Sequence, residues 1–147
     1  MILLKTDEEI ELIRESCLLV SRTLCEIASL MNPGVKTKQI DQAAETFIRD
    51  NGAIPGFLGY KDFPNTLCIS VNEQVVHGIP SDYELKNGDI VSVDCGVIKN
   101  NYYGDSAFTF AVGEVDKEKQ RLMDVTKQSL YKGIEQAVCG KRIGDIS

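Results

Sequence analysis

The chain has 147 residues, of which 43% are hydrophobic and 26% are charged, and its formal net charge is -6. A chain of this length can bury one sizeable core, so we expect residues 1–147 to form a single domain. The negative charge and the scattered Lys and Arg residues argue against nucleic-acid binding, and no apolar run is long enough to predict a membrane span.

Two helices are predicted in the first third of the chain. Residues 6–9 (TDEE) form a capping box, and apolar residues then recur at spacings of three and four from Ile10 to Met31. Such spacing places the apolar side chains on one stripe of a long helix. Thr37 is expected to cap a second helix over about residues 38–50.

The middle of the chain changes to a strand pattern. A short strand is predicted at 67–71, and residues 90–98 and 102–112 alternate between apolar and polar side chains. Asn100-Asn101 lies between the last two, and Asn tolerates the left-handed backbone of a tight hairpin turn. With a third helix at about 116–138, the order predicts an α+β fold in which helices cover one face of an antiparallel sheet.

Asp94 and Asp105 lie on the two arms of the predicted hairpin. With the turn at Asn100-Asn101, Asp94 faces Ala107 and is diagonal to Asp105 on the same sheet face, about 7–8 Å away at the backbone. Two carboxylates at this distance repel each other unless a cation lies between them. Gly96 follows on the same face, where a missing side chain would let another group approach the backbone closely.

Other interpretations of these residues stay open on spacing alone. Aspartates on a hairpin commonly face water, although Asp is depleted in strand interiors. His77 is the only histidine, and a lone histidine is usually a surface or structural residue. One His and two Asp are too few ligands for a complete hydrolytic metal site. The five cysteines lack any Cys-x-x-Cys pair, which favours reduced thiols in a cytoplasmic protein.

Several longer segments resemble one known family. They are residues 68–80 (CISVNEQVVHGIP), 88–94 (GDIVSVD), 103–106 (YGDS), 58–64 (LGYKDFP), 5–14 (KTDEEIELIR) and 32–37 (NPGVKT). In this order they resemble the motifs of type I methionine aminopeptidases, and the resemblance covers essentially the whole chain. The chain is similar to the N-terminal half of that family's "pita-bread" fold, in which two pseudo-symmetric halves form one catalytic domain.

The resemblance implies an enzyme that removes the initiator methionine from nascent proteins with two divalent metal ions, whether Co, Mn, Fe or Zn. By position, Asp94 would chelate one metal and Asp105 would bridge the two. His77 would bind the scissile amide of the substrate and stabilise charge in the tetrahedral intermediate. Tyr60, Phe63 and Cys68 would line the pocket for the methionine side chain.

The chain also departs from the family pattern. Phe63 stands where many relatives carry Tyr, and Phe57 where they carry a small residue. The family pattern therefore does not predict the shape of the methionine pocket in this chain. The family's remaining ligands, one His and two Glu, come from its C-terminal half. We therefore expect this chain to be truncated, to bind metal weakly or not at all, and to be inactive by itself.

Two other functions fit parts of the pattern. The chain could be a non-catalytic pita-bread homologue that acts as a binding module, or a related Xaa-Pro peptidase that shares the aspartate pair. Half of a pita-bread fold would also expose apolar sheet edge and helix surface. We therefore expect the chain to self-associate, with a second copy in place of the other half.

Overall fold

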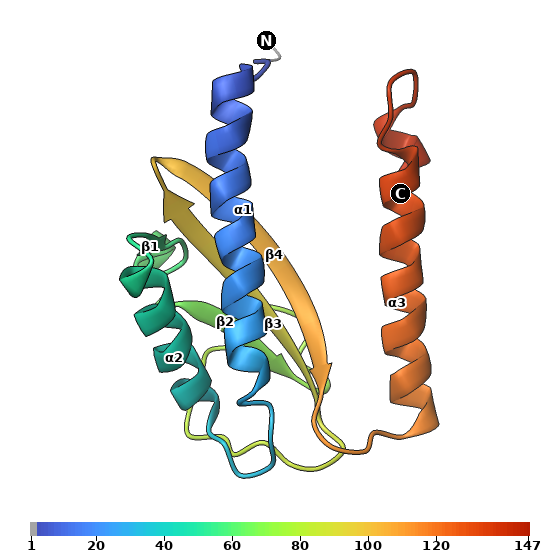
Figure 1. The fold of residues 1–147 in the computed structure, drawn as a ribbon. Helices are drawn as coiled ribbons and strands as arrows, with labels where there is room; N and C mark the ends of the chain where they lie inside the picture. Colours follow the sequence, from blue (N-terminus) through green and yellow to red (C-terminus); the bar gives the residue numbers. More distant parts are fainter. Residues whose placement is uncertain (1–2) are drawn as a thin grey trace. The chain divides into compact units, whose positions relative to one another are not determined.

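The computed structural model describes residues 3–147, which form two compact units that divide between Glu114 and Val115. The first unit contains α1 (Asp7–Ala28), α2 (Thr37–Asp50), β1 (Ile54–Pro55), β2 (Leu67–Val71), β3 (Ile90–Lys99) and β4 (Tyr102–Ala111), and the second contains α3 (Lys117–Gln136) (Figure 1). Short 3-10 helices lie at Tyr60–Asp62 and Ile143–Asp145. The predicted α+β class is confirmed, and the single domain stays a prediction.

The sheet of the first unit is built around β3. β1 and β2 pair with one edge of β3 and β4 pairs with the other, and every pairing is antiparallel. α1 and α2 lie together on one face of this sheet (Figure 1). The arrangement confirms the predicted antiparallel sheet with helices on one face, and it leaves the other face of β3 and β4 free of helices from this unit.

The core lies between the two helices and the sheet. Alternate residues of β3 point toward the helices and are fully buried, as period-two alternation predicts. These residues are Val91, Val93, Cys95 and Val97, and they pack with Leu19, Val20, Leu24 and Ile27 of α1 and with Ile40, Ala44 and Ile48 of α2.

The predicted apolar stripe of α1 is wrong at two positions. Ile10 and Cys17 are exposed, whereas Ser16 is fully buried. Ser16 is buried by a close crossing of α1 over β4, where a Cβ added at Gly104 would lie 2.5 Å from the backbone carbon of Ser16. At this crossing the Ser16 hydroxyl donates to the carbonyl of Tyr102 at 2.9 Å. Gly104 and Ser16 therefore allow α1 to pack closely against the β3–β4 hairpin.

The predicted cap of α2 is also wrong. The helix begins at Thr37 and its N-cap is Lys36, so Thr37 is the first helical residue. The Thr37 hydroxyl accepts from the backbone N–H of Ser81 at 2.9 Å and donates to the Ser81 carbonyl at 3.1 Å. A tertiary contact has thus replaced the local cap that the sequence suggested.

The other predicted boundaries hold to within a few residues. Thr6 caps α1 with the predicted capping box, and both Asn100 and Asn101 have positive φ in the hairpin turn. Gly133 is the buried residue of α3 and lies against Ile146 within the second unit. Among the described residues, no helix has the length and apolar character needed to cross a membrane.

A buried carboxylate joins α2 to the start of β2. Asp41 is 5% exposed, and its oxygens accept hydrogen bonds from the backbone N–H groups of Thr66 (3.0 Å) and Leu67 (2.8 Å) and from the side-chain amide of Asn65 (2.8 Å). Burial nevertheless raises the pKa of Asp41, and the three accepted hydrogen bonds oppose that rise. Asp41 therefore fixes the position at which β2 begins.

We predict that Asp41→Ala lowers the free energy of unfolding by about 3 kcal/mol, because two buried N–H groups lose their acceptor. Asp41→Asn should cost much less, since its oxygen can still accept from Thr66 and Leu67. A raised folded-state pKa means that stability is present below the unfolded pKa and is lost as pH rises through the folded value. Urea unfolding at several pH values should show this loss in the wild type and not in Asp41→Asn. The same dependence of the free energy of unfolding on pH in both proteins would contradict the prediction.

Candidate functional site

The β3–β4 hairpin places two aspartates on the face of the sheet opposite the helices. Asp94 is paired with Ala107 and Gly96 is paired with Asp105, so the two aspartates are diagonal neighbours across the strands. Both register positions are those predicted from the sequence. The site face, defined here as the side of β2, β3 and β4 that carries Cys68, Asp94 and Asp105, is therefore fixed by backbone pairing.

Asp94 carries an unsatisfied oxygen. Its Oδ1 is buried and has no hydrogen-bond partner among residues 3–147. Burial raises the pKa of Asp94, and the charge of Asp105 and a hydrogen bond between the two side chains raise it further. A lone pair that is removed from water and lacks a donor is costly unless a cation or proton satisfies it.

Cys68 lies beside the aspartates as the direct cross-strand partner of Asp94. Its side chain is buried, and burial, followed by the charges of Asp94 and Asp105, raises the pKa of its thiol to about 11. Cys68 is thus a neutral thiol at physiological pH and is unsuited to act as a thiolate nucleophile. An uncharged thiol is compatible with the predicted role of Cys68 in lining an apolar pocket.

His77 lies in the loop that follows β2 and is exposed. The pKa of Asp94 is raised first by burial and then by Asp105, and His77 is among the groups that oppose this rise. The backbone of His77 has φ 58, and Gly78 after it is bonded to β2. Sequence reasoning identified His77 but missed this anchoring; the Gly that follows the histidine was the available signal.

Tyr60 and Phe63 lie in the tight loop before β2. Tyr60 is exposed and Phe63 is half-buried, and the loop is closed by a bond from the Gly59 N–H to the Phe63 carbonyl at 2.8 Å. Their place beside the site face and their contact with a substrate both stay predictions.

The group that approaches Gly96 comes from the chain itself. A Cβ added at Gly96 would lie 2.5 Å from Cε1 of the Phe57 ring, so the ring lies against the glycine backbone. Gly56 next to it donates its N–H to the Gly96 carbonyl at 2.8 Å. The glycine at position 96 is thus explained by Phe57, which the sequence had marked only as a departure from the family pattern.

The chemistry of the site face fits a divalent cation in part. Asp94 and Asp105 supply two carboxylates. The buried Oδ1 of Asp94 accepts no hydrogen bond from the described residues, so its lone pairs are available to a cation. Within residues 3–147, however, no group of three or more His, Cys, Asp and Glu side chains is arranged to hold a metal ion. A complete coordination sphere would need further ligands, because divalent metals at catalytic sites take three or more protein ligands or waters.

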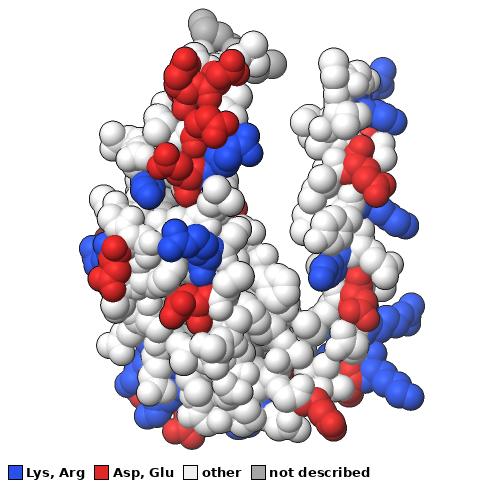
Figure 2. Space-filling view, viewed as in Figure 1, with Lys and Arg blue, Asp and Glu red and all other residues white. Residues whose placement is uncertain are grey.

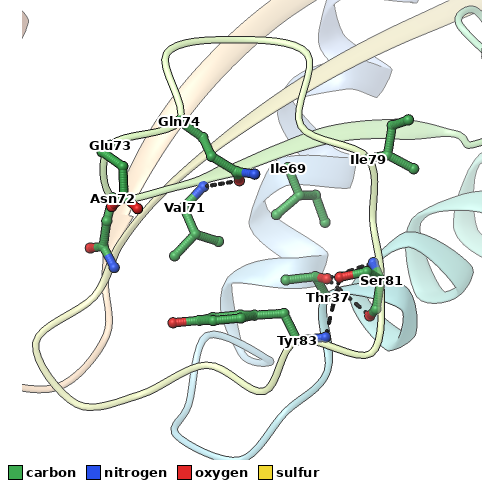
Figure 3. Close-up of a pocket in the computed structure, with 9 residues that line it drawn as sticks. All are labelled: Thr37, Ile69, Val71, Asn72, Glu73, Gln74, Ile79, Ser81 and Tyr83. Atoms are coloured by element: carbon green, nitrogen blue, oxygen red, sulfur yellow. Dashed lines mark hydrogen bonds between the residues drawn. The ribbon is translucent and has the colours of Figure 1, made fainter.

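A separate cavity of about 220 Å³ lies on the opposite side of β2. Its walls include Ile69 and Val71, whose side chains alternate with those of Cys68 and Ser70, and Tyr83 and Thr37 close it below (Figure 3). Gln74 lies at its rim and accepts from the Val71 N–H at 3.0 Å. The cavity therefore does not open onto the carboxylate pair.

The acidic residues visible on α1 are also distinct from the site. Asp7, Glu8 and Glu9 occupy the first turn and form part of an acidic patch along that helix (Figure 2). Negative side chains at a helix N-terminus are stabilised by the macrodipole, which accounts for this position. None of these three residues is among the causes of the shift in the pKa of Asp94.

Comparison with known proteins extends this picture. The profile of metallopeptidase family M24 matches residues 11–147. A methionine aminopeptidase of Clostridium acetobutylicum is 50% identical over the whole chain, which spans 59% of that relative's length. The crystal structure of methionine aminopeptidase from Rickettsia prowazekii has a TM-score of 0.89 and 40% identity, covering 91% of this chain and 54% of that one.

An Xaa-Pro dipeptidase from Bacillus anthracis has a TM-score of 0.80 at 24% identity, covering 92% of this chain and 37% of that one, and shares the fold alone. These neighbours are pita-bread peptidases, and the chain corresponds to a little over half of the methionine aminopeptidases it resembles. The family resemblance predicted from residues 68–80 and 88–106 is thereby confirmed. The chain belongs to metallopeptidase family M24.

Proposed function

We propose that the protein to which this chain contributes removes the N-terminal methionine from nascent proteins in the cytoplasm, using two divalent metal ions. The observation that carries this proposal is the aspartate pair of the hairpin, with its buried and unpartnered Asp94 oxygen. The relatives that resemble the whole chain are themselves named methionine aminopeptidases.

In this proposal Asp94 and Asp105 hold the metals, whether Co, Mn, Fe or Zn. The bound metals would supply a nucleophilic water at neutral pH and a Lewis acid for the substrate carbonyl. His77 would hydrogen-bond the scissile amide as charge develops on it, which fits an exposed imidazole in the loop that follows β2.

The same face offers a binding site for the methionine side chain. Cys68 contributes a buried neutral thiol, and Tyr60 and Phe63 contribute aromatic surface from the loop before β2. A thioether makes favourable contacts with aromatic rings and suits a polarisable apolar pocket. Phe57 fills the space over Gly96, so we propose that it bounds this pocket on the side of the hairpin.

Two carboxylates are an incomplete ligand set, so the chain by itself should bind metal weakly and cleave no peptide. We propose that the other ligands, one His and two Glu, come from sequence outside this chain, which spans 59% of its relative from Clostridium acetobutylicum. The joint presence of Asp94, Asp105 and His77 counts against a non-catalytic binding module, because a pure binding surface has no need of a buried unpaired carboxylate oxygen.

A chimera tests this function directly. In it, the segment of the Clostridium acetobutylicum enzyme that matches this chain is replaced by residues 1–147. We expect the chimera to release methionine from a Met-Ala peptide with added Mn²⁺ and to lose activity in EDTA. Asp94→Asn or Asp105→Asn should lower kcat/KM at least about a hundredfold, and His77→Ala about 10²–10³-fold. Residues 1–147 alone should release no methionine.

The matched control for the chimera is Asp50→Asn, an exposed aspartate at the end of α2, which should leave kcat/KM unchanged. A folded chimera that releases no methionine with Mn²⁺, Co²⁺, Fe²⁺ or Zn²⁺ would contradict the proposed function. So would release that survives the loss of both Asp94 and Asp105. Robust release by residues 1–147 alone would contradict the proposed inactivity of the chain.

We also propose that the chain by itself self-associates. β4 is the outer strand of the sheet in the first unit, and Tyr103 and Phe108 on it are 62% and 49% exposed. An exposed strand with free backbone groups and large apolar side chains is a template for pairing with another chain. A second copy related by a two-fold axis would present the same strand in antiparallel orientation.

Light scattering across a wide range of concentrations should therefore report a mass above 16.3 kDa for the chain. Phe108→Lys should shift the distribution toward the monomer, because a lysine on an edge strand opposes strand pairing. Leu18→Lys, at an apolar position on α1 that is 57% exposed, is the control and should have no effect. A single monomeric species at all concentrations would show that the edge is not used.

A further inference from the structure

The backbone of His77 is in an unusual conformation. Its φ of 58 lies in the left-handed region, which a residue with a side chain occupies only when its surroundings hold it there. Val75 and Val76 before it are 86% and 65% exposed, so packing of the preceding loop does not supply that restraint. The hydrogen bonds described next to His77 are those of the residue that follows it.

Gly78 follows His77 and is bonded to two successive residues of β2. Its N–H donates to the hydroxyl Oγ of Ser70 at 3.1 Å, and its carbonyl accepts from the N–H of Ile69 at 2.8 Å. A Cβ added at Gly78 would lie 2.1 Å from the Ile69 carbonyl oxygen, so only glycine allows this approach. The end of the loop is thus fastened to the edge of the sheet.

Ser70 holds one particular part of the loop. The N–H of Gly78 belongs to the peptide plane that joins it to His77, so an acceptor for that N–H restrains the rotation about the Cα–C bond of His77. Ser70 is 4% exposed and follows Cys68 by two residues, which places its hydroxyl on the site face of β2. At the other end of the loop, Gln74 accepts from the Val71 N–H (Figure 3).

We propose that Ser70 is a positioning residue for His77: by accepting from the Gly78 N–H, it holds the backbone of His77 at the edge of β2, next to the site face. This inference rests on the proposed function, because His77 needs a fixed position only if it contacts a substrate there. The proposal gives Ser70 no direct role in chemistry, because its buried hydroxyl is bonded to Gly78. Loss of its hydroxyl should release His77 while the sheet stays folded, since Ile69 still bonds Gly78.

Nuclear magnetic resonance of residues 1–147 tests this inference with a simple readout. The chain has one histidine, so its imidazole signals belong to His77 without further assignment. In Ser70→Ala we expect exchange of the Gly78 amide to accelerate about tenfold or more. The His77 Cα and Cβ shifts should leave their left-handed values, and the imidazole signals should broaden or move toward those of an unfolded peptide.

Two further variants separate positioning from stability. Ser70→Thr keeps the hydroxyl and should restore both the His77 shifts and the slow Gly78 exchange. Ser92→Ala is the matched control, because Ser92 lies directly opposite Ser70 and its hydroxyl pairs with Thr109 at 2.9 Å instead of with the loop. It should leave the His77 signals unchanged.

The inference is overturned if Ser70→Ala lowers the urea midpoint but leaves the His77 shifts and Gly78 exchange as in the wild type, which is the result of a merely structural role. If Ser70→Ala does not fold, amide hydrogen exchange in the wild type tests the inference instead. A Gly78 amide that exchanges as fast as the amides of Val75 and Val76 also overturns it. In an active chimera, Ser70→Ala should lower kcat more than it raises KM. A wild-type chimera without activity would count against the proposed function and leave the resonance result standing.

Discussion

The candidate site depends on the register of one β-hairpin. The pairing of Asp94 with Ala107 and of Gly96 with Asp105 puts both carboxylates on the same face at diagonal positions. A shift of one residue in either arm would turn one carboxylate into the core. The two carboxylates repel each other, and one oxygen of Asp94 is buried without a hydrogen-bond partner. A divalent cation bound between them would remove this unfavourable electrostatic interaction.

The rest of the first unit holds that register in place. α1 crosses β4 so closely at Gly104 that no side chain fits there, and the buried Ser16 hydroxyl bonds the carbonyl of Tyr102 beside the turn. On the other edge of β3, Asp41 fixes the first residues of β2, which brings Cys68 opposite Asp94. The core side of the sheet thus provides rigidity, and the opposite side carries polar groups that stability alone does not explain.

The sequence predicted the parts of this structure that depend on local pattern. The hairpin and its register followed from Asn100-Asn101 and period-two alternation, and the start of α1 followed from its capping box. Contacts between distant segments could not be predicted in this way. Thr37 bonds Ser81 instead of capping α2, and Gly96 makes room for Phe57 from a loop some forty residues earlier. The bond from Gly78 to Ser70 is likewise visible only once the loop is seen beside β2.

Urea unfolding of residues 1–147 and of Asp94→Asn, with EDTA and with Mn²⁺, tests the central claim that the aspartate pair requires a cation. In EDTA we expect the variant to be more stable by about 1 kcal/mol, because a neutral amide removes the repulsion by Asp105. Mn²⁺ at about ten times its dissociation constant should stabilise the wild type by about 1.4 kcal/mol and leave the variant unchanged. A variant that is less stable in EDTA, or an equal effect of Mn²⁺ on both proteins, would contradict the account.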